Sequence, residues 1–351
     1  SCLYRTWGLV EIAMKPHLRI AVGCVSLVAI SVLALSGCDR GIVNFPSHPD
    51  PAPLLPQNVL ATGNIMSYAG DGHAGYNGDI VRTKARLYWP IDCYVWQPTG
   101  EVYINDWNNH RIRLVDNATG FLNTVAGGQK LVDQTVNTLN HPTNIAFFSN
   151  RTLLICSWHN HQIRYETAPQ TLAILYSQGE GLIDNTRARQ CKLDLPTSID
   201  WGPDSTLYIS DQGNFRIRRV PADTSNVDGT LWLDTEGHTK RQPAQDRWIF
   251  TFAGTGQAGF DGDTPKPANQ VKFFNPRGTG SYPGSRLKTS PDGNWLYYCD
   301  TWNNRVRKID LTGDVSADHM VYTVAGGASP VTTPPAINGV DDGAMFAGDG
   351  G

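Results

Sequence analysis

The chain has 351 residues and a formal net charge of −3, with 17% charged and 40% hydrophobic residues. Because it contains no block of five or more basic residues, it lacks the electrostatic footprint of a nucleic-acid-binding protein, and we exclude nucleic acid as a partner. The 35 glycines and 22 prolines, together with 10% aromatic residues, favour many short strands joined by turns.

The first 58 residues predict a leader followed by a tether. Residues 1–13 precede the first methionine, and we expect them to be upstream residues that are not native to the protein. Residues 14–37 have a basic start, an apolar run and small residues at the end, which is typical of a secretory signal peptide. The run is nearly long enough to span a bilayer, so an uncleaved signal anchor is the alternative. Residues 38–58 are rich in proline and predict an extended tether.

The end of the leader carries a second signal. Residues 35–38 read Leu-Ser-Gly-Cys and resemble the bacterial lipobox. The resemblance implies cleavage after Gly37 and a diacylglycerol group on the sulfur of Cys38. It therefore implies an exported lipoprotein, anchored in the membrane of a bacterial cell envelope on the periplasmic side or at the cell surface.

The remaining residues, 59–351, contain one motif four times, beginning at residues 102, 153, 207 and 296, with spacings of 51, 54 and 89. Each copy has an apolar half, then Asp or Ser, then a turn with Asn, then a half that alternates polar and apolar residues. This pattern predicts a β-hairpin. A strand that begins with proline precedes the hairpin, and a strand that ends in Ala-Gly or its equivalent follows it. The units lie near residues 64–127, 128–179, 180–254 and 255–327, residues 328–351 look like the start of another, and residues 221–246 are a polar insertion.

A unit of four short antiparallel strands is too small to be stable alone. Radial packing around an axis buries both faces of each sheet and leaves only short edges, whereas a linear solenoid usually has shorter repeats without hairpin turns. We therefore predict an all-β fold, a β-propeller of four-stranded antiparallel blades preceded by a signal segment. Four complete blades are visible, and we expect an incomplete ring whose parent protein has six or more blades.

The combined motifs resemble those of the NHL-repeat β-propeller family. The resemblance rests on the strand that begins with proline, on Leu/Val-Tyr-Ile-x-Asp, on Asn-His/Phe-Arg-Ile-Arg and on Thr-Val-Ala-Gly, and it covers about residues 64–351. The loops of type Ala-Gly-x-Gly-x-Ala-Gly-Phe-x-Gly-Asp resemble the secreted bacterial type in particular. Asn109-His110-Arg111-Ile112 fits the family pattern best, whereas Asn214-Phe215 and Asn304-Arg305 lack the histidine.

Polar residues recur at fixed places in the hairpin turns. Repeated carboxylates could serve metal binding or acid–base chemistry, but Asp and Asn at a turn commonly bind backbone N–H groups, and the following Arg can bridge strands or blades. Ser157 replaces the aspartate in the second unit, which a structural role survives more easily. We therefore interpret these residues as a structural turn network: Asp106, Asn109, Arg111, Asn160, Asp211, Asn214, Arg216, Asp300, Asn303 and Arg305.

The sequence assembles no catalytic or metal-binding set. Acidic residues in the Gly-rich loops would suit calcium, but each loop has few of them and no complete calcium-binding loop is present. Lyases of the family hold zinc with histidines near the central channel, yet the residues equivalent to His141 in two other units are Trp89 and Leu195. We therefore predict no catalytic residue, metal or cofactor, with calcium and zinc as alternatives.

Tryptophans near the turns are candidates for ligand binding. Exposed aromatic rings are good platforms for sugars or protein partners, although packing between blades explains them equally well. The candidates are Trp107, Trp158 and Trp302 in the turns and Trp232 in the insertion. We predict a lipid-anchored NHL propeller that acts as a non-catalytic scaffold for a protein or glycan. The alternative is a propeller enzyme of the lyase or lactonase type, with channel residues partly in further C-terminal blades.

Overall fold

The computed structural model describes residues 66–97, 99–128, 138–222, 247–278, 281–313 and 319–326. The predictions for the signal peptide, the tether, Cys38, Trp232 and residues 328–351 lie outside these ranges, as does nearly all of the predicted insertion. Within them, no helix is long and apolar enough to cross a membrane.

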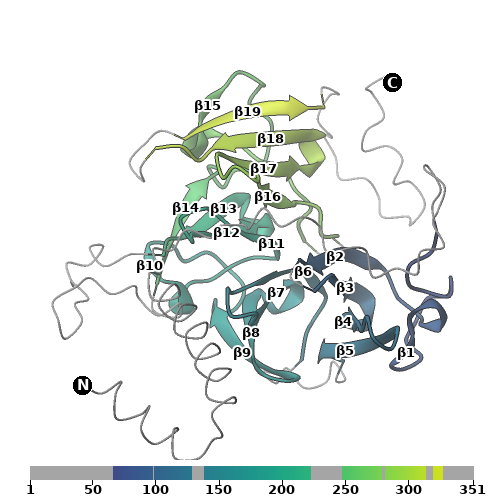
Figure 1. Cartoon of the computed structure of the whole chain (residues 1–351). Helices are drawn as coiled ribbons and strands as arrows, with labels where there is room; N and C mark the ends of the chain where they lie inside the picture. The colour runs from purple at the N-terminus through teal and green to yellow at the C-terminus, as the bar shows by residue number, and fades with distance from the viewer. Residues whose placement is uncertain are drawn as a thin grey trace, which may run out of the picture. The chain divides into compact units, whose positions relative to one another are not determined.

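Four antiparallel sheets form the described fold (Figure 1). Blade 1 contains β2 (Pro90–Trp96), β3 (Glu101–Asp106), β4 (Arg111–Val115) and β5 (Phe121–Gly127). Blade 2 contains β6 (Pro142–Phe147), β7 (Leu153–Ser157), β8 (Gln162–Ala168) and β9 (Thr171–Tyr176). Blade 3 contains β11 (Pro196–Trp201), β12 (Leu207–Asp211), β13 (Arg216–Val220) and β14 (Trp248–Ala253). Blade 4 contains β16 (Leu287–Thr289), β17 (Trp295–Asp300), β18 (Arg305–Asp310) and β19 (Met320–Ala325).

The prediction of an all-β propeller with four antiparallel blades is confirmed. Blades 1, 3 and 4 each gain a fifth, two-residue strand from the preceding loop, which pairs with the outermost strand and covers its edge. These strands are β1 (Ile80–Val81), β10 (Thr186–Arg187) and β15 (Lys266–Pro267). In Figure 1 the first strand of each blade lies nearest the common centre and the last strand lies farthest from it.

Each hairpin turn is one short 3₁₀ turn that ends in a left-handed residue. The turns are η2 (Trp107–Asn109), η3 (Trp158–Asn160), η5 (Gln212–Asn214) and η8 (Thr301–Asn303). The residue that follows each turn has a φ between 52° and 56°, a conformation that His and Asn tolerate better than a bulky apolar residue such as Phe215. The four such residues are His110, His161, Phe215 and Asn304. The other 3₁₀ turns in the described ranges are η1 (Arg82–Lys84), η4 (Ala188–Gln190) and η7 (Ala268–Gln270).

The Ala-Gly ending of the outer strands has a steric cause. Gly127 has a φ of 77°, and a Cβ atom there would lie 2.2 Å from the carbonyl oxygen of His110. Gly254 repeats this arrangement in blade 3, where a Cβ atom would lie 2.4 Å from the carbonyl oxygen of Phe215. Glycine therefore suits the point where the outer strand passes the end of the hairpin turn in these two blades, whereas blade 2 has Ser177 there with a φ of 75°.

Hydrophobic clusters join neighbouring blades. One cluster packs Tyr103 and Ile112 of blade 1 against blade 2, a second packs blade 2 against blade 3, and a third packs blade 3 against blade 4. Strands β7 and β12 are buried along their whole length, whereas β17 alternates buried and partly exposed residues. Blades 2 and 3 are therefore covered on both faces and blade 4 mainly on one. No hydrophobic cluster in the part of the chain described joins blade 4 to blade 1.

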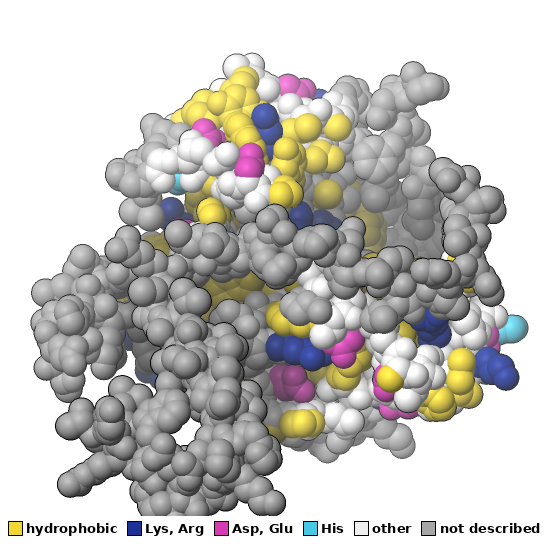
Figure 2. Space-filling model, in the orientation of Figure 1, with side chains coloured by type: hydrophobic (Ala, Val, Ile, Leu, Met, Phe, Trp, Pro, Cys, Tyr) yellow, Lys and Arg dark blue, Asp and Glu magenta, His cyan; other side chains and the backbone are white. Residues whose placement is uncertain are grey.

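Charged side chains on the surface are mixed. On the face drawn in Figure 2, acidic and basic side chains lie interspersed among hydrophobic ones. The described part of that face therefore carries no extended patch of one sign.

Candidate functional site

The hub of the propeller presents one equivalent position from each inner strand. Asp92, Asn144 and Ser198 follow a register shift at the start of β2, β6 and β11. Arg286, immediately before β16, holds the equivalent position in blade 4. The equivalence follows from the next residue, Leu287, which pairs with β17 as the corresponding residues pair in the other blades. The four positions read Asp, Asn, Ser and Arg, so the described hub has no repeated histidine or carboxylate.

The Arg286 side chain ties the four blades together. Its Nη1 atom donates hydrogen bonds to the carbonyl oxygens of Thr143 (2.6 Å) and Thr197 (3.4 Å), and its Nη2 atom donates to the carbonyl oxygen of Ile91 (3.1 Å). Nη1 also lies 3.5 Å from Oδ2 of Asp92. A planar guanidinium carries five donors and can serve several acceptors at once. Arg286 therefore connects blade 4 to blades 1, 2 and 3.

The other hub side chains bind one another. Asn144 Nδ2 donates to Asp92 Oδ2 at 2.6 Å, and the Asn144 Oδ1 atom accepts the backbone N–H of Ile199 at 2.8 Å. Thr197 Oγ1 lies 2.9 Å from Ser285 Oγ, which in turn lies 2.7 Å from the hydroxyl of Ser210. These hydroxyls have neither a histidine nor a carboxylate among those partners, so they form a packing network and no activated nucleophile.

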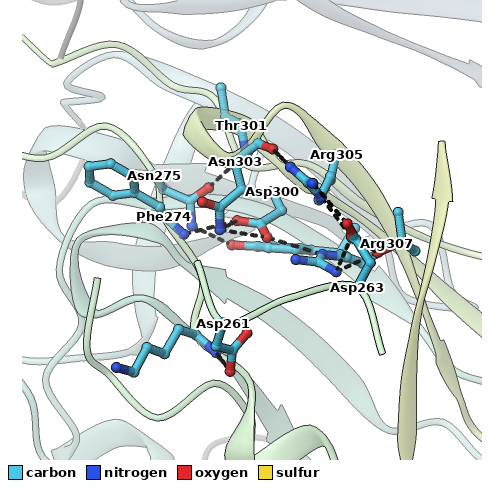
Figure 3. A network of polar contacts seen from close by, with 12 residues as sticks. Asp261, Asp263, Phe274, Asn275, Asp300, Thr301, Asn303, Arg305 and Arg307 are labelled. Atoms are coloured by element: carbon cyan, nitrogen blue, oxygen red, sulfur yellow. Dashed lines mark hydrogen bonds and ion pairs between the residues drawn. The ribbon is translucent and has the colours of Figure 1, made fainter. Parts of the chain in front are cut away.

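The turn aspartates are buried and bonded in one repeated pattern, shown for Asp300 in Figure 3. The carboxylate of Asp300 accepts the N–H of Phe274 (2.9 Å), the amide of Asn303 (2.9 Å) and Nε of Arg307 (3.2 Å). Burial raises the pKa of Asp300 to about 6 and also raises the pKa of the two equivalent carboxyls. The equivalent sets are Asp106 with Tyr88, Asn109 and Arg113, and Asp211 with Asp194, Asn214 and Arg218.

The arginine that meets each aspartate lies two residues beyond the one selected from the sequence. Arg113, Arg218 and Arg307 reach the carboxylates. Arg111 instead lies over the ring of Tyr76, 3.8 Å from its centroid, and Arg305 binds Asp263 at 2.7 and 2.8 Å. The Arg305 hydrogen bond lowers the pKa of Asp263 to about 2. Arg216 donates to the carbonyl oxygen of Thr255 at 3.0 Å, so this second set of arginines binds the Gly-rich loops.

A signal in the sequence could have found the first set. All four copies of the motif end on this arginine, including Arg164 of blade 2, whereas Gln162 replaces the equivalent of Arg111 there. In blade 2 Ser157 Oγ donates to Oδ1 of Asn160 at 2.5 Å. The same Asn160 oxygen accepts the N–H of Asn140 at 2.9 Å, so the amide oxygen serves as an acceptor near the position of the absent carboxylate.

The candidate ligand-binding tryptophans are buried. The exposed fractions of Trp107, Trp158 and Trp302 are 6%, 0% and 6%. Trp107 and Trp158 pack with Leu195 against Ile91 at the end of the hub where the hairpin turns lie. Trp302 is the second residue of its turn, whereas the other two are the first, and its Nε1 atom donates to the Tyr282 hydroxyl at 3.0 Å. The expectation that these rings are exposed is therefore wrong, and packing between blades accounts for them.

Exposed aromatic surface at this end of the hub comes from another residue, Trp89. Its ring is 58% exposed, and its centroid lies 5.4 Å from that of Trp107. The ring centroid of His141 lies 4.4 Å from that of Trp107. We call Trp89, Trp107 and His141 the aromatic platform. Trp89 was not among the ligand-binding candidates from the sequence, although its position directly before Pro90 of an inner strand was an available signal.

Histidines at the same end link blades through hydrogen bonds. The N–H of His141 donates to Nδ1 of His110 at 3.0 Å, and the N–H of Leu195 donates to Nδ1 of His161 at 3.1 Å. Nδ1 of His141 lies 2.8 Å from Nδ1 of His159. Burial lowers the pKa of His141 to about 3 and that of His159 to about 4, so both rings are neutral at pH 7. In the described ranges, no three His, Cys, Asp or Glu residues are grouped so that they could hold a metal ion.

Comparisons with known proteins give distant similarities. No family model matches the chain. The chain is 24% identical to mouse Teneurin-4 over 299 residues, which cover 73% of this chain and 10% of Teneurin-4. It is 37% identical to Teneurin-1 of Gallus gallus over 73 residues, which cover 20% of this chain and 2% of that protein. The chain thus spans about a tenth or less of the length of these curated relatives.

The names of solved structures that are similar to this fold describe different functions. An auxiliary nutrient binding protein from Bacteroides ovatus has 16% identity and a TM-score of 0.42, covering 69% of this chain and 48% of its own. A putative gluconolactonase has 17% identity and a TM-score of 0.39, covering 68% and 64%. Virginiamycin B lyase from Staphylococcus aureus has 13% identity and a TM-score of 0.36, covering 69% and 55%. Neither the identities nor the TM-scores assign this chain to a family.

Proposed function

We propose that this protein is a non-catalytic binding scaffold whose aromatic platform holds a glycan. The observation that carries the proposal is Trp89, which is 58% exposed and whose ring lies against that of Trp107. The ring lies at the end of the hub, and its flat face suits the C–H face of a sugar ring. The platform offers one such face and the neighbouring edge of His141.

Two buried donors also favour a hydroxyl-bearing ligand. The indole N–H groups of Trp107 and Trp158 lie buried without a hydrogen-bond partner among the residues described. An unpaired buried donor costs about 1–3 kcal/mol. A hydroxyl group, of water or of a ligand seated at the platform, that reached these N–H groups would relieve that cost. A glycan provides several hydroxyls next to an apolar face.

The bonding of the polar groups in the described turns and hub supports binding over catalysis. The three turn carboxylates of the described blades each bind an amide and a guanidinium, and the hub hydroxyls bind one another. The histidine rings at the platform serve as hydrogen-bond partners between blades. A propeller enzyme of the lyase or lactonase type would need a base or metal ligands from outside the described ranges.

The family and the anchor are part of the same proposal. The hairpin motif, in particular residues 109–112, supports an NHL-repeat propeller, and the Leu-Ser-Gly-Cys end of the leader supports a lipid on Cys38. The lipid would hold the propeller at the membrane of a bacterial cell envelope, with the proline-rich residues as tether. Labelling of cells with radioactive palmitate tests this part: label should appear on the wild type and be lost in Cys38→Ala, and label retained in the variant would refute it.

A glycan array tests the binding function. The wild-type protein should bind a defined subset of glycans, and Trp89→Ala should weaken that binding at least tenfold, because the stacking surface is lost. Trp295→Ala is the matched control, since Trp295 is another partly exposed tryptophan, in β17 of blade 4, and its loss should leave glycan binding unchanged. Equal loss in both variants, or binding that survives Trp89→Ala, would contradict the proposed site.

A further inference from the structure

A cavity of about 370 Å³ opens between blades 1 and 2, away from the aromatic platform. The platform lies where the hairpin turns begin, whereas this cavity lies at the opposite ends of the strands, where β6 turns into β7. Its size suits a small organic molecule. The residues that decide its chemistry are Tyr103, Val125, Phe147, Arg151, Leu153 and Glu166.

The floor of the cavity is apolar and aromatic. Phe147 and Leu153 are almost fully buried, and the Phe147 ring is surrounded by three other rings of blade 1. The centroid distances to Phe147 are 5.1 Å for Tyr94, 4.9 Å for Trp96 and 4.9 Å for Tyr103. Several aromatic rings around one floor favour alkyl groups and also cations, which are attracted to the faces of such rings.

The positive charge on the wall is already matched. The guanidinium of Arg151 forms an ion pair with Glu101 and donates a hydrogen bond to the Tyr103 hydroxyl at 3.0 Å. These two contacts hold the guanidinium against blade 1, and the ion pair with Glu101 compensates its positive charge. A ligand anion would therefore have to compete with Glu101 for the arginine.

The negative charge on the wall is not matched. Glu166 lines the cavity from β8 and has no ion pair with a cation among the residues described. Burial raises the pKa of its carboxyl, while the N–H of Gln170 and the charge of Arg151 act in the opposite direction. Glu101, which does not line the cavity, compensates the charge of Arg151, so the carboxylate of Glu166 leaves one net negative charge beside an apolar floor.

We propose that this cavity binds a small alkylammonium ion, with its ammonium group at the Glu166 carboxylate and its alkyl chain on Phe147 and Leu153. The ligand supplies the counterion that Glu166 lacks, and its chain packs against the apolar lining of the cavity. A carboxylate ligand of the same length would meet two glutamates, and an alcohol would leave the charge of Glu166 uncompensated. The proposal does not depend on glycan binding at the platform.

The first test compares three probes of equal length on the intact wild-type protein. n-Butylammonium, n-butanol and n-butyrate are titrated at pH 7.5 and constant ionic strength, and binding is followed by amide NMR shifts around Phe147 and Leu172. We expect n-butylammonium to bind saturably and at least tenfold more tightly than the other two. Equal affinity of the three probes, or a preference for n-butyrate, would overturn the proposal without recourse to any variant.

The second test removes the charge of Glu166. Glu166→Gln keeps the shape of the side chain and should weaken n-butylammonium binding at least tenfold, while n-butanol binding should not change. Glu180→Gln, at an exposed glutamate in the loop after β9, is the matched control and should bind as the wild type does. If Glu166→Gln does not fold, Glu166→Asp serves in its place, because it keeps the charge and should keep the preference for the cation. Unchanged affinity in Glu166→Gln, or loss of the cation preference in Glu166→Asp, would refute the site.

Discussion

The joints between blades at the end of the hub are built in two ways. At the first two joints a histidine at the end of the hairpin turn accepts the N–H of the residue before the next inner strand: His110 from His141, and His161 from Leu195. At the third joint Phe215 holds that position, and Gln212 forms the connection. The first two joints thus depend on titratable rings and the third on a neutral amide, which predicts that they respond differently to mutation and to pH.

At the third joint one side chain, that of Gln212, forms several hydrogen bonds. Nε2 of Gln212 donates to the carbonyl oxygens of Pro276 (2.8 Å) and Tyr282 (3.0 Å), and Oε1 accepts the N–H of Gly284 (2.9 Å) and of Ser285 (3.2 Å). Inner strand β16 begins only at Leu287, whereas the other inner strands begin at a proline. Gln212 therefore holds a loop where the other blades have the start of a strand.

The largest effect is expected from Gln212→Ala. Gln212 is fully buried, and its loss leaves backbone donors and acceptors of the loop unpaired, so we expect a loss of about 3 kcal/mol in the free energy of unfolding. Urea unfolding followed by tryptophan fluorescence measures it, and proteolysis should become faster between residues 276 and 286. Gln257→Ala, at an exposed glutamine, is the control and should be neutral. A loss below about 1 kcal/mol would show that other contacts hold this loop.

The second-largest effect on stability is expected from acidification, which should weaken the first joint. The pKa of His141 is lowered to about 3 and that of His159 to about 4, mainly by burial, whereas an unfolded histidine titrates near pH 6.5. Between about pH 6.5 and pH 4 the unfolded state therefore binds more protons than the folded state, and stability falls as the pH falls. After allowance for solvent screening we expect a loss of about 1–2 kcal/mol from pH 7 to pH 5.

A variant separates this contribution from those of other groups. His141→Leu introduces the residue that blade 3 has at the equivalent position, Leu195. The raised pKa of Asp300 adds a dependence of opposite sign, because its folded state binds a proton more tightly, but this contribution is the same in both proteins. Urea unfolding at pH 7, 6 and 5 should therefore give a smaller loss in His141→Leu than in the wild type. Parallel losses in the two proteins would contradict the assignment.

His110→Ala should have a smaller effect at pH 7. It removes the acceptor of the His141 N–H, and we expect a loss of about 1 kcal/mol in the free energy of unfolding. His73→Ala, at a histidine of the first Gly-rich loop whose side chain is 73% exposed, should be neutral within about 0.5 kcal/mol. Equal losses in the two variants, measured by urea unfolding at pH 7, would mean that the hydrogen bond between the blades does not stabilise the joint.

A structural feature of this protein can be predicted from the sequence when residues close together in the chain determine it. The hairpins are predictable because strand alternation and turn residues act within a dozen residues, so the sequence alone identifies Asp106 and Asn109 as turn residues. The partner of Asp106 is not predictable in this way, since Arg111 and Arg113 share one face of β4 and only the packed loops decide which arginine reaches the carboxylate. The turn pattern is local, whereas the choice between two arginines depends on tertiary packing.

The burial of the aromatic rings could not be predicted from the sequence, because it also depends on tertiary packing. Trp107 and Trp158 lie in turns, which are usually exposed, but the inner strands of neighbouring blades converge on them. Trp89 lies one residue before an inner strand and remains exposed because the Trp107 ring already covers the end of the hub beside it. Cys156 and Cys299 occupy one motif position but differ in burial, since blade 3 covers blade 2 while the outer face of blade 4 is partly open.

The smallest effect on stability is expected when the phenylalanine of the third joint is placed at the equivalent position of the second joint. His161→Phe keeps an aromatic ring at a left-handed position where Phe215 already occurs, so ring packing and backbone conformation should be retained. What is lost is the acceptor for the Leu195 N–H, and we expect a cost of about 0.5–1 kcal/mol in urea unfolding. His161→Asn, which keeps an acceptor but loses the ring, separates the two contributions. If the Phe variant is as stable as the wild type while the Asn variant is not, the joint depends on ring packing, and the histidines matter for their shape rather than for their nitrogen atoms.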